Sequence, residues 1–87
     1  MGDMHFIQIE MSNERLANDV KFSVLDNKVA RTVTLVSSTR SYLIEGQVRD
    51  QKAFVVTFQT EKLEEIKTMM QEPTMKAASM SAWEMAA

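Results

Sequence analysis

The feature that most constrains the fold is a strand pattern that passes directly into a helix pattern in the second half of the chain. Residues 52–60 alternate between apolar and polar side chains, which is the period of a half-buried β-strand. Residues 61–72 have helical periodicity, and Pro73 ends the helix because proline has no backbone donor. This unit predicts a strand followed by a helix, with Thr60 as the helix N-cap. It says more about the fold than about chemistry.

A second strand pattern lies near the start of the chain, at residues 4–11. Ile7 and Ile9 fall on one side of this strand, whereas Gln8 and Glu10 fall on the other.

Two structures compete for the following segment, residues 13–28. Asn13 can cap a helix, and a stripe containing Val20 and Val24 favours a helix over residues 13–27. Residues 19–24 also alternate, however, and the pair at positions 26 and 27 is typical of turns. The segment is therefore a helix or a hairpin, and the sequence leaves both open.

Residues 31–48 are rich in β-branched and polar side chains, which predicts a second strand that is either long or interrupted by a bulge or bend at positions 37–39. Gly46 inside this pattern indicates a bulge or a close approach of the backbone. Residues 49–51 predict the turn that joins this strand antiparallel to the next. The tail, residues 74–87, fits a short helix or a closing strand near Trp83.

The order of elements predicts a single α+β domain over residues 1–87. Its arrangement is ferredoxin-like, βαββα with a possible final β-strand. The alternative is an antiparallel β-meander followed by C-terminal helices. A chain of 87 residues buries a modest share of its surface, so association into a homodimer is a natural way to enlarge its core.

Composition removes several classes of function. The chain has no cysteine and one histidine, which excludes thiolate chemistry and a multi-histidine metal site within one chain, so we expect neither a metal nor a cofactor. The net charge is −2 and the basic residues are scattered, so we expect no binding to nucleic acid or membranes. No apolar run approaches the roughly 20 residues of a membrane span, and the first residues lack a signal peptide, which predicts a cytoplasmic protein.

Three segments resemble the dimeric α+β barrel superfamily: residues 4–9, residues 55–58 and residues 63–76. This superfamily includes stress-responsive A/B barrel proteins, antibiotic-biosynthesis monooxygenases and small polyketide cyclases. The resemblance implies a homodimer that binds or transforms a small apolar or aromatic molecule without a metal. In cyclase-like members a histidine near the start of the first strand is important, and His5 matches it. A second histidine follows the helix-ending proline in those members, where this chain has Thr74.

Two groups of residues are candidates for a site. His5 or Glu10 is the candidate catalytic base, since imidazole titrates near neutral pH and burial raises the pKa of a carboxyl group. Polar residues on one face of the sheet are candidates for ligand binding because buried polar groups need partners. This polar face comprises Gln8, Glu10, Thr57 and Gln59, together with Glu45 or Gln47. Arg40 and Tyr42 are further ligand-binding candidates that would orient an anionic or phenolic ligand. An enzyme and a noncatalytic ligand-binding or protein-interaction dimer both remain open.

Overall fold

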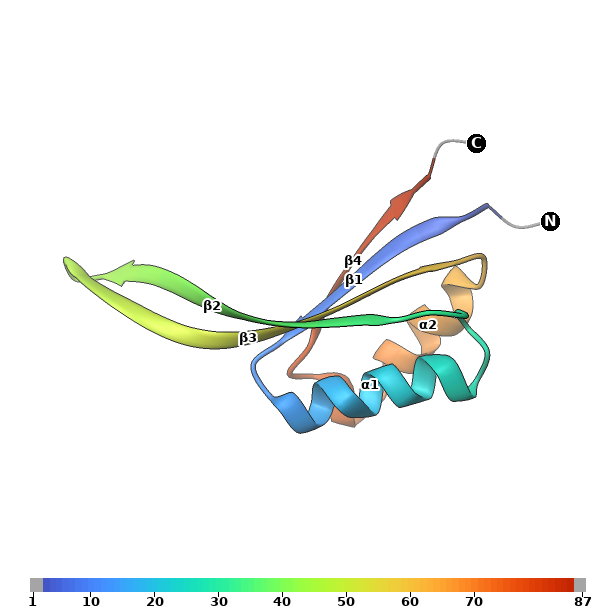
Figure 1. The fold of residues 1–87 in the computed structure, drawn as a ribbon, viewed down its shortest axis with the longest axis horizontal. Helices are drawn as coiled ribbons and strands as arrows, with labels where there is room; N and C mark the ends of the chain where they lie inside the picture. Colours follow the sequence, from blue (N-terminus) through green and yellow to red (C-terminus); the bar gives the residue numbers. More distant parts are fainter. Residues whose placement is uncertain (1–2, 86–87) are drawn as a thin grey trace.

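The protein folds into a four-stranded antiparallel sheet with two helices on one of its faces (Figure 1). The computed structural model describes residues 3–85. Along the chain the elements are β1 (His5–Met11), α1 (Glu14–Asp26), β2 (Thr34–Ile44), β3 (Gln47–Thr60), α2 (Leu63–Met70), a short 3₁₀ helix η1 (Pro73–Met75) and β4 (Ser79–Glu84). The strands lie in the order β2-β3-β1-β4. This βαββαβ arrangement confirms the predicted α+β, ferredoxin-like class.

Helix α1 decides between the two structures that the sequence leaves open for residues 13–28. The Asn13 side chain accepts a hydrogen bond from the backbone N–H of Leu16 at 3.1 Å, so the N-cap forms as predicted. The helix buries Ala17, Val20 and Val24 against the sheet. The hairpin, and with it the β-meander alternative, is therefore wrong.

The connection between β2 and β3 differs from the prediction. β2 pairs with β3 without interruption from Thr34↔Thr57 to Ile44↔Gln47, so the long strand forms and no bulge lies at positions 37–39. The turn lies at Glu45 and Gly46, not at residues 49–51, which belong to β3. Both turn residues have positive φ, 51° and 78°, as a two-residue type I′ turn requires. Gly46 thus forms a turn and not a bulge.

The segment after β3 also differs in detail from the prediction. The N-cap of α2 is Lys62, not Thr60. The Thr60 hydroxyl instead donates to the Val29 carbonyl at 2.6 Å and accepts from the backbone N–H of Lys62 at 2.9 Å. Pro73 begins η1, and β4 then pairs antiparallel with β1. The closing strand, one of the two structures considered for the tail, is therefore present.

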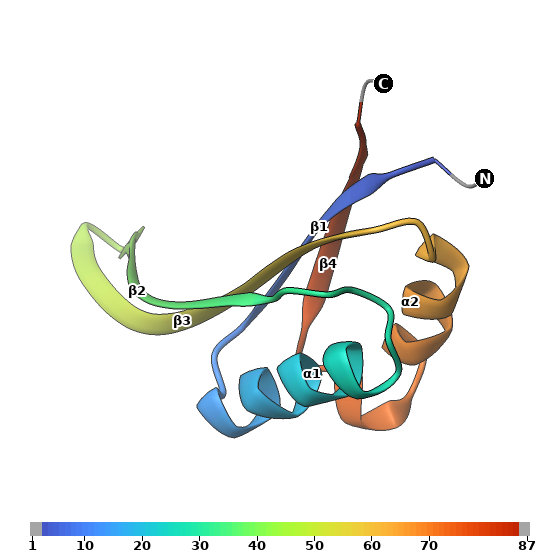
Figure 2. The ribbon, with the colours of Figure 1, turned by 45° about the vertical axis from the view of Figure 1, so that its right-hand side comes forward.

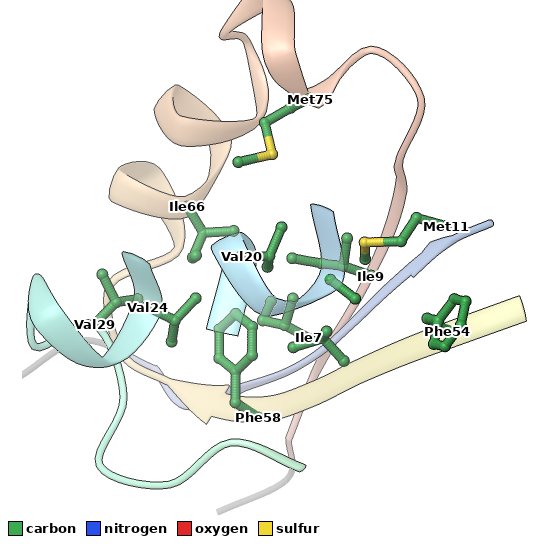
Figure 3. Packing of buried hydrophobic residues seen from close by; sticks show 12 residues of the cluster. Ile7, Ile9, Met11, Val20, Val24, Val29, Phe54, Phe58, Ile66 and Met75 are labelled. Carbon is green, nitrogen blue, oxygen red and sulfur yellow. The ribbon is translucent and has the colours of Figure 1, made fainter. Parts of the chain in front are cut away.

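The core lies between the helices and the odd-numbered residues of β1 (Figure 3). Ile7 is directly opposite Phe58, and Ile9 is opposite Val56. Ile66 of α2 and Val24 of α1 close this core from the helix side (Figure 3). The alternation read from the sequence therefore predicts the buried face correctly. None of the helices in residues 3–85 is long and apolar enough to cross a membrane.

The far part of the β2–β3 hairpin projects beyond the rest of the molecule (Figures 1 and 2). We call residues 39–52 the hairpin arm. β1 pairs with β3 only from Phe54 onward, so the two strands of the arm pair with each other alone. Every residue of the arm is exposed. The radius of gyration is 14.2 Å, against about 12 Å for a compact domain of this length, which the arm explains.

Candidate functional site

The sheet face turned away from the helices, which we call the open face, is the candidate site. The strand register places alternate residues of all four strands on it. All four predicted polar residues lie there. Its members are Phe6, Gln8 and Glu10 of β1, Val36, Arg40 and Tyr42 of β2, Val55, Thr57 and Gln59 of β3, and Ser79, Ser81 and Trp83 of β4.

A polar row crosses the middle of the open face. Gln8 of β1 lies directly between Thr57 of β3 and Ser81 of β4. Gln8 and Thr57 are half-buried, and no buried side-chain nitrogen or oxygen in residues 3–85 lacks a hydrogen-bond partner. The row therefore contains no polar group that needs a ligand to satisfy it.

An ion pair joins Glu10 and Arg40 at one end of the open face. The Glu10 side chain is 26% exposed and that of Arg40 is 54% exposed, so water reaches both partners. They lie in an open cleft of about 190 Å³ that also contains Gln51 and Ser79. In this structure the Glu10 carboxylate is the partner of the Arg40 cation.

His5 lies far from Glu10. The strand alternation places His5 on the helix side of β1, whereas Glu10 is on the open face. The His5 Nδ1 atom is 3.1 Å from the Asp3 carbonyl oxygen, within hydrogen-bonding distance. Five residues of strand separate the two side chains by about 17 Å. The two candidate bases therefore cannot act on the same reacting group.

The remaining predicted binding residues are also spread out. Gln59 lies at the His5 end of the sheet, opposite Phe6. Tyr42 is on the hairpin arm, opposite Arg49, and is 40% exposed. Glu45 lies in the turn at the tip of the arm and Gln47 follows it. Neither Glu45 nor Gln47 therefore belongs to the polar row, because both lie at the tip of the arm, far along the strands from Thr57.

An aromatic pair, which the sequence did not reveal as a pair, lies at the other end of the open face. The Phe6 and Trp83 rings have centroids 5.8 Å apart and are tilted by 41°, a favourable geometry for aromatic contact. Trp83 is nevertheless 50% exposed. The pair arises because β4 is a strand, which puts position 83 opposite position 6.

The hairpin arm has large apolar side chains that nothing else in residues 3–85 covers. Leu43 is 70% exposed and lies opposite Val48, which is 71% exposed. Ile44, at 50%, lies on the other side of the same ribbon. The signal in the sequence is the consecutive run Tyr42-Leu43-Ile44, which does not alternate as a half-buried strand does.

Metal ligands do not converge in the part of the chain that the structure describes. Among residues 3–85, no three His, Asp or Glu side chains form a group that could hold a metal ion. The acidic groups are distributed over the surface, and Glu10 is already paired with Arg40.

Comparison with known proteins gives a clear structural relationship. No protein-family model and no curated protein matches the sequence. Solved structures do match. The divalent ion tolerance protein CutA1 from Ehrlichia chaffeensis has a TM-score of 0.76 at 13% identity, over 100% of this chain and 85% of that chain. The periplasmic divalent cation tolerance protein CutA from Archaeoglobus fulgidus has a TM-score of 0.73 at 18% identity, over 97% and 85%. A third, the divalent cation tolerance protein from Thermus thermophilus, has a TM-score of 0.71 at 17% identity. The match covers 97% of this chain and 85% of that chain.

These matches show the fold and correct the resemblance drawn from the sequence. The structural neighbours are CutA proteins, not members of the dimeric α+β barrel superfamily, so the predicted membership is wrong. The physical reason is that the strand-helix-proline unit of residues 52–73 specifies an element order that different families share. The Archaeoglobus protein is described as periplasmic. The cytoplasmic location of this chain remains a prediction from its sequence.

Proposed function

We propose that this protein is a noncatalytic homo-oligomer whose subunits associate through the hairpin arm and the open face of the sheet. The observation that supports this most directly is the exposure of Leu43 and Val48 on opposite strands of the arm. The oligomer is the working form in this proposal, and a single chain is an incomplete unit of it.

The arm is the part of the chain that most needs a partner. A two-stranded hairpin is marginally stable in water unless it packs against something else. Within residues 39–52 the two strands pair only with each other, and the ion pair of Arg40 with Glu10 links the base of the arm to β1. Large exposed apolar patches on a soluble protein typically mark interaction surfaces. Covering this arm with a second copy would bury apolar groups on both of its sides.

The sheet edges offer two ways to associate. β2 and β4 are the edge strands, and each has one free row of backbone donors and acceptors. Pairing β2 with β2, or β4 with β4, would give the two-fold homodimer expected from the sequence. Pairing β2 of one copy with β4 of the next would give a ring where the rotation between copies closes and an open filament where it does not. The first arrangement leaves one edge of each sheet free, whereas the second covers both.

The geometry supports binding over catalysis. His5 and Glu10 lie on opposite faces, and Glu10 is paired with Arg40. The polar row around Gln8 lies between two open clefts and lines neither of them. A reaction chamber for a small apolar or aromatic molecule would therefore require walls from a second copy. A divalent cation, which the names of the structural neighbours mention, would likewise require ligands from more than one copy.

Analytical ultracentrifugation of paired variants tests this proposal. Val48→Lys places a charge on the arm, where Val48 is 71% exposed. Phe22→Lys places the same charge at a comparably exposed apolar position of α1, where Phe22 is 63% exposed. We expect Val48→Lys to shift the protein toward lower mass and Phe22→Lys to leave the mass unchanged. Equal effects of the two substitutions, or no effect of Val48→Lys, would contradict association through the arm.

A further inference from the structure

A basic cavity lies where two connecting segments meet, away from the Glu10 end of the open face. Residues 28–32 lead from α1 into β2, and residues 59–62 lead from β3 into α2. Together with Met4 these segments line an open cavity of about 480 Å³, which is within the usual size range of small-molecule sites.

The charge of this cavity is opposite to that of the whole protein. Lys28, Arg31 and Lys62 line it, whereas Glu61 is its one lining carboxylate. The chain as a whole has a net charge of −2. Neither ion pair found in residues 3–85 involves any of the three cations. Like charges that line one cavity repel one another, and a bound anion would relieve that repulsion.

Hydrogen bonds hold together the two segments that carry these cations. The buried Thr60 hydroxyl donates to the Val29 carbonyl at 2.6 Å and accepts from the Lys62 backbone N–H at 2.9 Å. The Lys62 ammonium group donates to the Lys28 carbonyl at 3.3 Å. These contacts place residues more than 30 positions apart in the sequence around one space, so the cavity does not have to form when a ligand arrives.

The other lining residues indicate what the anion is attached to. Met4 and Ala30 provide accessible apolar surface beside the cations, whereas Val29 is buried in the core beneath it. Methionine side chains adapt to ligands of irregular shape. An apolar body would pack against this surface while its anionic group contacts the cations.

We propose that this cavity binds a small organic anion, a phosphate or carboxylate group on an apolar or aromatic body. The site is formed within one chain, so it goes beyond self-association and does not depend on it. Its ligand contacts are the Lys28, Arg31 and Lys62 side chains for the anionic group and the Met4 and Ala30 side chains for the apolar part.

Amide chemical shifts measured by NMR during titration test the site directly. Phenyl phosphate and benzoate distinguish the two anionic groups, and phenol is the neutral control. We expect one or both anions at millimolar concentration to shift the amides of residues 28–32 and 59–62, while phenol at the same concentration shifts them little. Shifts that are equally large with phenol, or that spread evenly over the protein, would overturn the proposal. The proposal would also be overturned if neither anion shifted these amides at about 10 mM, since a site of this kind should bind with a dissociation constant below that concentration.

Charge-removing variants identify the ligand contacts. Lys28 has φ of 57°, so Lys28→Asn removes its charge with a residue that tolerates this backbone conformation. The double variant Arg31→Gln/Lys62→Gln should weaken binding about tenfold, since each exposed charge contact contributes roughly two- to fivefold. The double variant Lys21→Gln/Lys76→Gln, outside the cavity, removes the same charge and is the matched control, which should bind as the unmodified protein does. Equal weakening in the control would show non-specific attraction only and would overturn the assignment.

Discussion

Glu10 and Arg40 form an ion pair across the open face although their strands are not neighbours. β3 lies between β1 and β2 in the sheet, so the long Arg40 side chain reaches over it to the Glu10 carboxylate. The pair links the edge strand β2 to a central strand near the start of the hairpin arm. The ion pair also gives Glu10 a structural role that does not require catalysis.

We expect this ion pair to make a small contribution to stability. Both partners are reached by water, and exposed pairs of this kind contribute about 0.5 kcal/mol. A double-mutant cycle with Glu10→Gln and Arg40→Gln, measured by urea unfolding, should give a coupling free energy of this size that falls as salt is added. A coupling above about 2 kcal/mol would mean that the pair is shielded from water, for example by another subunit.

Thr60 is expected to be sensitive to loss of its hydroxyl group. Thr60→Val keeps the shape of the side chain but leaves the Val29 carbonyl and the Lys62 N–H without their partner. The free energy of unfolding should fall by about 2 to 3 kcal/mol, because unpaired buried polar groups are costly. Thr60→Ser retains the hydroxyl and should lose less than half of that amount. Equal losses in the two variants would show that packing, and not hydrogen bonding, determines the effect.

Ile66 should be the main anchor of α2. It is fully buried in the middle of a helix of eight residues. Ile66→Ala should lower the free energy of unfolding by about 3 kcal/mol, through lost apolar burial and the cavity that remains. Leu25→Ala, at a position of α1 that is 38% exposed, should cost clearly less. If the two variants were equally stable in thermal unfolding, α2 would not be packed as described.

The hairpin turn gives a prediction about backbone conformation. No atom lies within 4 Å of a Cβ added at Gly46, so an alanine there meets no steric clash. Its cost comes from φ of 78° alone, and Gly46→Ala should destabilise the protein by about 1 kcal/mol. Glu45→Asn should instead stabilise the protein, since asparagine adopts the positive φ found at position 45 more readily than glutamate does. A stabilising Gly46→Ala substitution in urea unfolding would contradict the turn geometry.

The sequence predicts well those elements whose residues contact the core. Alternation at Ile7 and Ile9, and at Val56 and Phe58, identifies the buried face because one side of each strand packs against the helices. The Asn13 cap likewise appears in the structure as expected. In these places local pattern and tertiary packing favour the same conformation.

Prediction fails where no core imposes a pattern. In the hairpin arm neither face is buried, so polar residues such as Arg49 and Asp50 resemble a turn although they pair within a strand. β4 is an exposed edge strand whose alternation is weak for the same reason. The basic cavity could not be found from sequence because Lys28 and Lys62, 34 positions apart, come together through tertiary contacts, among them the Thr60 hydrogen bonds and the bond from the Lys62 ammonium group to the Lys28 carbonyl.

The central claim, that the working form contains several copies of the chain, is tested most directly by multi-angle light scattering at micromolar concentration. One chain has a mass of 9.9 kDa. We expect a single species whose mass is two or more times this value, because the arm around Leu43 and Val48 needs a second copy to cover it. A species of 9.9 kDa that persists as the concentration is raised would contradict the account.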